Sequence, residues 1–341
     1  MRSRGVTSPS LSNAPAPLRL CLHGHGLQPI PSPFQGSIES VVWQHTLHLR
    51  ALGHHVSLVN VRPRKVLKEM WRVHEQEGPF DWVITHHERM VAPLAKYAKA
   101  TGARLAACTH MPVTGYQLLD KFSQGRMLMV AKAPYHLCLT PDALLTIRTL
   151  NRDAQATILP NGVNTHQFAF NPDPGNGRAI CIGLLCERKR QAEVAAACPM
   201  YPIDFVGPID KEHAPSVALR ESPRYAGEWS REEVYRRMTD YSALVLYSSS
   251  EGQPLVIMEA FAAGLSVVVS PEASRNLDMT KPWIFKVRRV EDIPAALARA
   301  TAENARHRAA IRAHVEAEWS WAKVAERLEG CLRAWDAEAG R

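Results

Sequence analysis

The sequence predicts an α/β protein of two doubly wound parallel-sheet domains that face each other across a cleft. First, apolar runs of strand length alternate with helical patterns along most of the chain. Second, this alternation stops at a Pro/Gly-rich segment, residues 171–178, and then restarts. Third, the chain ends in a long helical pattern without a further strand. Alternation of this kind is typical of a parallel sheet with helices on both faces.

The first half begins with "LRLCLHGHG" (18–26), an apolar run that ends in glycines and predicts a buried strand leading into a loop. Residues 37–53 have helical spacing, and Gly53 is the expected stop. Another helix is expected over 89–102. Further strands are expected at 55–61, 81–87, 104–110, 136–141 and 156–162.

The second half repeats this arrangement after the linker 171–178. Strands are expected at 179–185, 203–208, 243–249 and 266–270, and helices at 190–198, 231–241 and 254–264. From residue 306 onward the pattern is helical. The predicted domains are residues 18–172 and 173–320, with a final helix at 321–341.

Composition bounds the class of protein. The chain has 341 residues, 46% hydrophobic and 22% charged, which is enough for two domains with full cores. Residues 1–17 carry two arginines and no apolar region, so we expect a disordered tail rather than a signal peptide. No apolar run approaches the eighteen or so residues of a membrane span. Seven irregularly spaced cysteines without a CxxC pair indicate buried thiols in a reducing cytoplasm.

The net charge of +8 lies entirely in the first half. Residues 1–175 contain 18 Lys and Arg against 10 Asp and Glu, whereas residues 176–341 contain 23 of each. Such asymmetry predicts that the first half meets an acidic partner. A basic surface that is merely solvated is the alternative.

The segment "EGQPLVIMEA" (251–260) places two carboxylates eight residues apart beside buried segments. Glu251 falls in the turn after a strand, and a helix is expected to start near Pro254, a favoured first-turn residue. The helix N-terminus suits a phosphate group. Carboxylates accept hydrogen bonds from the hydroxyls of a sugar or a ribose diol. The alternative is that Glu251 only caps the helix and Glu259 is a surface residue.

These residues carry a resemblance to a known family. The pair Glu251 and Glu259 within "SSSEGQPLVIMEAFAAGLSVVVS" resembles the signature of retaining nucleotide-sugar glycosyltransferases of family 4, which have the GT-B fold of two Rossmann-like domains. "QGSIESVVWQHTLHLRALGHHVSLV", "ILPNGVNTHQF" and "IGLLCERKRQ" are similar to further family segments in the same order. The resemblance covers residues 18–330. It implies that the C-terminal helix returns to the first domain.

The resemblance implies roles for individual residues. Glu251 would approach the donor sugar's hydroxyls, and Glu259 would bind the ribose diol. The sugar and diphosphate would meet the backbone of Gly252, Gln253, Pro254, Leu255 and Val256. Gly36 and Ser37 match paired glycines that approach the β-phosphate, although Ser37 replaces the second glycine. His110 matches a histidine on the acceptor side of the cleft, and a purely structural histidine is the alternative.

The basic loop departs from the family pattern. The family usually has Gly-Arg followed later by lysine, but here Leu184 follows Gly183, so the usual arginine is absent. Lys189 keeps the lysine position. Arg188 or Arg190 would then supply the missing charge, because a leaving diphosphate needs cationic stabilisation. The alternative for Arg190 is a solvated residue at the start of a helix.

No metal or cofactor is expected. The histidine pairs 23/25, 54/55 and 86/87 lack a third ligand at a suitable spacing, and the chain has no Asp-x-Asp motif. The donor nucleotide sugar would be a co-substrate.

The resemblance therefore implies metal-independent sugar transfer, with retention, from a nucleoside-diphosphate sugar in the second domain to a hydroxyl acceptor in the first. A glycolipid or saccharide of cell-envelope polysaccharide synthesis is the first expectation for the acceptor. Hydroxymethylated DNA, which phage enzymes of this fold modify, is the main alternative, followed by a small molecule. A non-catalytic sugar-nucleotide binder is an alternative of another class. No obligate protein partner is expected.

The segment "VRPRKVLKEMWR" (61–72) clusters cations with apolar residues, as a helix at a membrane interface does. Duplex DNA would attract the same charge. We expect a cytoplasmic protein, and peripheral binding to the inner membrane face is left open. The expected acceptor surface consists of Arg62, Arg64, Lys65, Lys68 and Arg72.

Overall fold

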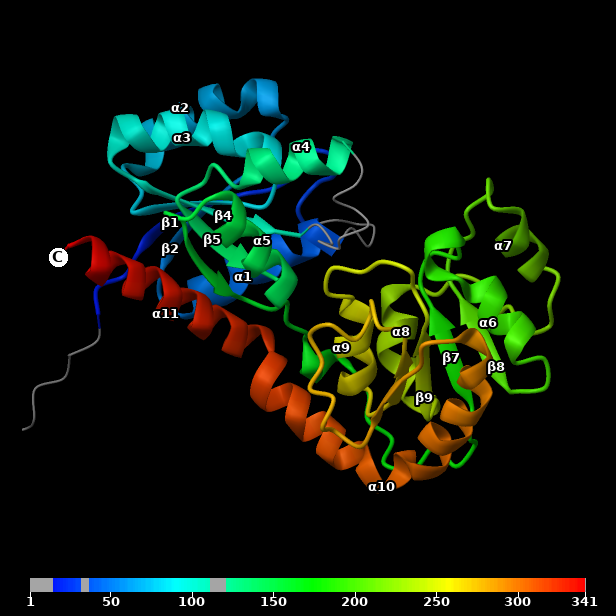
Figure 1. The fold of residues 1–341 in the computed structure, drawn as a ribbon. Helices are drawn as coiled ribbons and strands as arrows, with labels where there is room; N and C mark the ends of the chain where they lie inside the picture. Colours follow the sequence, from blue (N-terminus) through cyan, green and yellow to red (C-terminus); the bar gives the residue numbers. More distant parts are fainter. Residues whose placement is uncertain (1–14, 32–36, 111–120, 341) are drawn as a thin grey trace, which may run out of the picture.

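The structure, a computed structural model, describes residues 15–31, 37–110 and 121–340, which form two lobes with one parallel sheet each (Figure 1). The first sheet has the strand order β2-β1-β3-β4-β5-β6, and the second has the order β11-β10-β9-β7-β8. We call the lobes the first and the second domain.

The first domain follows the predicted alternation. Its strands are β1 (Arg19–His23), β2 (His55–Val59), β3 (Trp82–Thr85), β4 (Arg104–Thr109), β5 (Tyr135–Cys138) and β6 (Gln155–Ile158). Its helices are α1 (Ser37–Ala51), α2 (Val66–Glu77), α3 (Val91–Thr101), α4 (Lys121–Val130) and α5 (Pro141–Leu150).

The second domain repeats the pattern. Its strands are β7 (Ala179–Ile182), β8 (Ile203–Val206), β9 (Ala243–Leu246), β10 (Ser266–Val269) and β11 (Ile284–Lys286). Its helices are α6 (Gln191–Ala197), α7 (Ala214–Leu219), α8 (Arg231–Arg237), α9 (Leu255–Ala262) and α10 (Ile293–Trp319).

The strand order fixes where ligands can bind. In the first sheet β1 lies between β2 and β3, and in the second β7 lies between β8 and β9. The winding direction reverses at these strands, and in doubly wound sheets ligands bind beyond the strand carboxyl ends at such points. Ligands are therefore expected at the loops after β1, β3, β4, β7 and β9.

Close backbone packing explains the glycines that end β7 and β8. Gly183 and Gly207 have φ of +134° and +129°. A Cβ atom on Gly207 would lie 2.3 Å from the carbonyl oxygen of Gly183. A side chain at position 207 would therefore push apart the loops after β7 and β8 at the carboxyl edge of the second sheet.

The final helix, α11 (Trp321–Ala339), returns to the first domain. Helices α10 and α11 form a bent rod along both lobes, and the bend is at Ser320 (Figure 1). The buried face of α11 packs against the helix α1 and the strands β1 and β3. It consists of Trp321, Val324, Ala325, Leu328, Leu332 and Trp335. This spacing places one apolar stripe along the helix.

The predicted fold class is confirmed: both domains are parallel-sheet α/β units, and the last helix crosses back. Several elements were not predicted from the sequence, namely β11, α4, α5 and α7. The helical pattern from residue 306 forms two helices, and the second begins at Trp321, as predicted, where the Ser320 side chain caps it by accepting from the Lys323 N–H. The expected tail at 1–17 lies outside the described residues up to residue 14.

The connection between the domains is anchored by Arg308, a fully buried side chain on α10. Its guanidinium donates to the backbone carbonyls of Asn171, Thr239, Tyr241 and Ala263, and to the Asn304 side chain, at 2.7–2.9 Å. Burial lowers the pKa of Arg308 to about 10, so it stays charged at neutral pH. Upstream of the predicted linker, Val163 and Phe168 already pack into the second domain's core.

Replacing Arg308 with Met is expected to destabilise the protein by about 3–5 kcal/mol, because the substitution leaves several buried carbonyls without a donor. The measurement is the free energy of unfolding in urea. Arg306→Met, on the same helix with a side chain 72% exposed, is the matched control. Its expected change is about 0.5 kcal/mol or less. Equal changes in both variants would contradict the anchoring role.

Candidate functional site

The turn after β9 gathers two cations around one carboxylate. Glu251 is 9% exposed, and its Oε1 accepts from Ser248 Oγ at 2.8 Å. The same oxygen lies 2.9 Å from Arg188 Nη1 and 3.3 Å from Lys189 Nζ. Arg188 also donates to the carbonyl of Ser250 at 2.7 Å. The three charges leave an excess of one positive charge, which suits an anionic ligand.

The loop after β7 presents Arg188 and Lys189 to this turn but directs Arg190 elsewhere. Arg190 has a positive φ of 53°. Its guanidinium lies 5.7 Å from the centre of the Tyr247 ring, and it pairs with Glu193 at 3.6 Å. Of the two arginines left open by the sequence, Arg188 is therefore the one at Glu251. Leu184, where the resemblance expects arginine, is 44% exposed.

The turn that precedes α9 also contacts the loop after β6. Gln253 Oε1 accepts from the backbone N–H of Asn161 at 2.5 Å, while Gln253 Nε2 is buried without a hydrogen-bond partner among the described residues. Pro254 occupies the N-cap position, and Leu255 and Val256 open the helix. Gly252, like Leu255 and Val256, is half-buried. The Ile257 N–H donates to the Pro254 carbonyl at 3.1 Å, whereas the first N–H groups of a helix have no acceptor within the helix and suit an anion.

Glu259 pairs with a residue that the sequence analysis missed. Arg231 Nη1 lies 2.5 Å from Glu259 Oε1, and the Arg231 guanidinium lies 4.5 Å from the centre of the Tyr235 ring. Burial works to lower the pKa of Arg231, but Glu259 and Tyr235 outweigh it and hold the pKa above its ordinary value. Arg231 thus stays charged and fixes the Glu259 carboxylate, which is 13% exposed.

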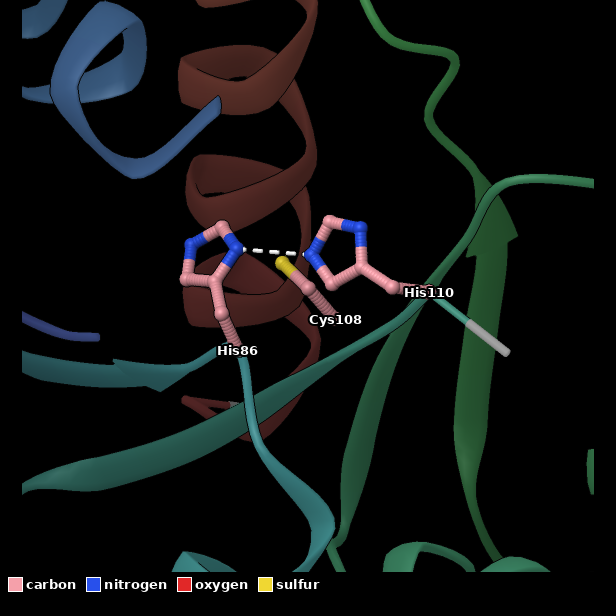
Figure 2. Close-up of side chains that lie close together, drawn as sticks. All are labelled: His86, Cys108 and His110. Carbon is pink, nitrogen blue, oxygen red and sulfur yellow. Dashed lines mark hydrogen bonds between the residues drawn. The ribbon is translucent and has the colours of Figure 1, made fainter. Parts of the chain in front are cut away.

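On the first domain, His110 forms a cluster with His86 and Cys108. His86 Nδ1 and His110 Nε2 are hydrogen-bonded at 2.9 Å, and the rings are stacked with centres 5.1 Å apart. Figure 2 shows the two imidazoles facing each other with the Cys108 sulfur between them. The cluster lines a cavity of about 150 Å³ that also includes His25, Glu88 and Arg126.

The sequence analysis expected no third metal ligand beside the pair His86 and His87, because none has a suitable spacing in sequence. It therefore missed this cluster. His86 follows β3, while Cys108 and His110 lie at the end of β4. The parallel register pairs Thr85 with Ala107, so the next residues along each strand, His86 and Cys108, lie side by side. Burial lowers the pKa of His110 to about 4 and that of His86 well below its ordinary value. Both rings are therefore neutral at physiological pH.

The other predicted phosphate contact is only partly described. Gly36 lies outside the described residues, and Ser37 is the first residue of α1.

The predicted acceptor surface is exposed, but its apolar residues face inward. The basic stretch, as we call it, consists of Arg62, Arg64, Lys65, Lys68 and Arg72, all exposed. Val66, Met70 and Val73 are buried, because α2 packs this face onto the domain. Trp71 is 40% exposed, yet its ring contacts the rings of His74 and Tyr97. Three of the apolar residues of α2 thus face the domain, and the cations remain exposed; binding to a membrane surface stays a prediction.

Among the described residues, every helix is too short or too polar to cross a membrane.

Comparisons with known proteins agree with this architecture. Residues 210–315 match the family model "Glycosyl transferases group 1". The chain is 23% identical over 254 residues to the putative glycosyltransferase EpsF of Bacillus subtilis, a match that covers 65% of each chain. The chain thus spans slightly less than two thirds of the length of this curated relative.

Solved structures match over nearly the whole chain. Sucrose-phosphate synthase from Thermosynechococcus elongatus is similar with a TM-score of 0.71 and 16% identity, covering 94% of this chain and 100% of the other. HepE from Anabaena, in complex with UDP and glucose, is similar with a TM-score of 0.73 and 13% identity, covering 93% and 100%. The chain therefore has the GT-B fold of these structures, and its second domain carries the glycosyl transferases group 1 match.

Proposed function

We propose that the chain is a glycosyltransferase that moves a sugar from a nucleoside-diphosphate donor to a hydroxyl acceptor with retention of anomeric configuration. The observation that carries this proposal is the convergence of Arg188 and Lys189 on Glu251 at the carboxyl edge of the second sheet. HepE, which shares the fold, was solved with UDP and glucose bound. A nucleotide-sugar donor fits the charges of this chain at the corresponding edge.

The donor diphosphate would be held by Arg188, Lys189 and the N–H groups at the start of α9. The leaving nucleoside diphosphate gains negative charge as the glycosidic bond breaks, and fixed cations and N–H dipoles stabilise that charge. Glu251, which neutralises one of the two cations in the structure, would accept hydrogen bonds from the donor sugar's hydroxyls. The net positive charge of Arg188, Lys189 and Glu251 would therefore be better matched by the negative charge of the transition state than by a site without a donor. We infer that transfer needs no divalent cation.

Glu259 would bind the ribose diol, because Arg231 holds one of its oxygens and leaves the carboxylate able to accept further hydrogen bonds. Glu259→Gln is expected to weaken binding of the free nucleoside diphosphate roughly ten- to hundredfold, since hydrogen bonds to a charged acceptor contribute about 1.5–3 kcal/mol. Titration calorimetry with UDP, GDP and ADP measures it. The matched control is Glu193→Gln, at an exposed carboxylate paired with Arg190. Unchanged affinity in Glu259→Gln would contradict the assignment.

Retention is tested on the product. Incubation with the donor that turns over, followed by NMR of the new glycosidic linkage, should give the donor's anomeric configuration. Inverted configuration would overturn the retaining part of the proposal while leaving sugar transfer in place.

For the acceptor we propose a saccharide or glycolipid at an anionic membrane surface. The net charge of +8 lies in the first half of the sequence, and the basic stretch is exposed on the first domain. Helix α2 lies on the part of this domain remote from the second domain (Figure 1). The basic stretch therefore fits a role in holding the chain on an anionic surface, rather than in contacting the reacting hydroxyl. Such a location would be cytoplasmic and peripheral.

Reversing Arg64, Lys65 and Lys68 to Glu is expected to weaken liposome binding by more than about a hundredfold, because each cation near an anionic membrane contributes about 1 kcal/mol. Co-sedimentation with phosphatidylserine vesicles across a salt series measures it. The matched control reverses Arg289, Arg299 and Arg306, which are at least 70% exposed on the second domain.

The same salt series on duplex DNA tests the alternative acceptor. Each phosphate neutralised contributes a slope of about −0.9 in log K against log salt. Binding to DNA alone, with transfer to hydroxymethylated bases, would favour DNA modification and contradict the membrane proposal. Absence of binding to both the vesicles and the duplex DNA would show that the basic stretch is only solvated.

A further inference from the structure

His86, Cys108 and His110 form a donor set that the proposed transfer reaction does not require in full. One potential ligand atom from each of the three residues lies within 4.8 Å of the others. Figure 2 shows the imidazoles directed toward each other, with the sulfur beside the gap between them. Two nitrogens and one sulfur from the carboxyl ends of β3 and β4 thus lie close together.

The hydrogen bonding of this cluster is incomplete. The bond between His86 Nδ1 and His110 Nε2 occupies one nitrogen of each ring. His86 is 2% exposed, and its Nε2 has no hydrogen-bond partner among the described residues. The buried Thr109 Oγ1 also lacks one. The unpartnered Nε2 lies on the side of the His86 ring away from His110 (Figure 2), so it can carry the ring proton when Nδ1 binds an ion.

We propose that His86, Cys108 and His110 bind a thiophilic divalent cation, with Zn²⁺ as the ion of choice. Neutral imidazole and thiolate are the ligands that Zn²⁺ prefers, whereas Mg²⁺ and Ca²⁺ prefer oxygen ligands. Three protein ligands leave a fourth tetrahedral position open. The adjoining cavity of about 150 Å³, lined also by His25 and Glu88, has room for a water or a further ligand there.

Binding requires a small contraction and the loss of one proton. Metal–ligand bonds of about 2.0–2.3 Å require the three ligand atoms to move closer than their present spread. The hydrogen bond between the two histidines breaks, and the donating ring shifts its proton to its other nitrogen. The Cys108 thiol releases its proton to solvent as the sulfur–metal bond forms. One proton is released per ion, so affinity rises with pH.

The consequence for function, which depends on the proposed transfer reaction, is inhibition. His110 is the residue that we place on the acceptor side of the cleft, and a bound ion occupies its Nε2. Zn²⁺ is therefore expected to slow transfer, whereas a chelator leaves transfer intact. This site would regulate the enzyme and take no part in the chemistry.

Cobalt(II) titration of the full chain, after removal of metal by a chelator, tests the site directly. We expect a thiolate-to-cobalt absorption band, saturation at one ion per chain, and calorimetric release of about one proton with Zn²⁺. Cys108→Ala should abolish the band and weaken Zn²⁺ binding by at least about tenfold. Cys331→Ala, a half-buried cysteine on α11, is the matched control and should retain both.

X-ray absorption of the zinc-loaded wild type should show one sulfur and two imidazole nitrogens, which keeps the test valid if a variant does not fold. A cobalt complex without sulfur, or equal binding by Cys108→Ala and wild type, would overturn the site. Stoichiometric binding in a chain that transfers no sugar would support the metal site and overturn only the proposed reaction. Transfer that is insensitive to saturating Zn²⁺ would overturn the inhibition.

Discussion

Lowering the pH from about 7.5 to about 4.5 is expected to unfold the protein, because buried histidines of the first domain resist protonation. Burial lowers the pKa of His23 to about 4 and that of His45 to about 3. The ring nitrogens of both side chains lack hydrogen-bond partners among the described residues. Unfolding returns these groups to solvent, where the ordinary pKa is about 6.5.

The direction in which the free energy of unfolding changes with pH follows from proton binding. Below about pH 6.5 the unfolded chain binds protons that the folded chain does not, so the free energy of unfolding falls as the pH falls. The stability is fully present above that pH and is lost toward pH 4 and below. The two histidines together account for roughly 6 kcal/mol by pH 4, comparable to the whole stability of a typical domain.

Urea unfolding followed by circular dichroism at a series of pH values measures the effect. His86, His110 and His136 also have pKa values lowered by burial. His45→Gln removes one group of this set and should reduce the loss of stability by pH 4 by about 3 kcal/mol. His55→Gln, at an exposed histidine at the start of β2, is the matched control and should keep the wild-type slope. The same acid slope in His45→Gln and wild type would contradict the account.

Replacing Lys189 with Ala is expected to reduce the rate of sugar transfer about a hundredfold, the effect typical of losing one electrostatic donor at a developing charge. Lys189 Nζ lies 3.3 Å from Glu251, and its side chain is 13% exposed. Binding of the uncharged free nucleoside should change little, because the lysine acts on the diphosphate. Steady-state kinetics and nucleoside titration separate the two effects.

Arg190→Ala is the matched control for this prediction. Arg190 is in the same loop, yet it faces Tyr247 and Glu193 instead of Glu251. We expect its transfer rate to stay within a factor of about three of wild type, as for a surface change of up to about 0.5 kcal/mol. Comparable losses in both variants would indicate that the loop acts as a whole rather than through Lys189.

The fold could be predicted because most strands are short apolar runs that are separated in sequence by loops or by helical patterns. Strand β11 escaped prediction, since its three residues are too few to show a pattern. Helix α5 has sequence signals in Thr140, its N-cap, and Pro141 in its first turn, but the apolar run that precedes them favoured a strand through Pro141. The start of the final helix was predicted at residue 321, where α11 begins, although the segment before it contains neither Gly nor Pro.

The site could be predicted where its residues follow the carboxyl ends of predicted strands. Glu251 and Lys189 fall in loops at strand ends, where the alternation itself indicates a ligand site. Arg231 contacts Glu259 from another helix, so spacing gives no signal for it. His86 meets His110 through the register of β3 and β4, which a single sequence does not reveal.

The central claim is that the chain turns over a nucleoside-diphosphate sugar at the edge formed by Glu251, Arg188 and Lys189. The most direct measurement is release of free nucleoside diphosphate from a panel of UDP-, GDP- and ADP-sugars, with and without saccharide or glycolipid acceptors. The account predicts turnover of at least one donor, unaffected by chelation and strongly reduced in Lys189→Ala. A folded wild-type chain that neither binds nor turns over any donor in the panel would contradict it.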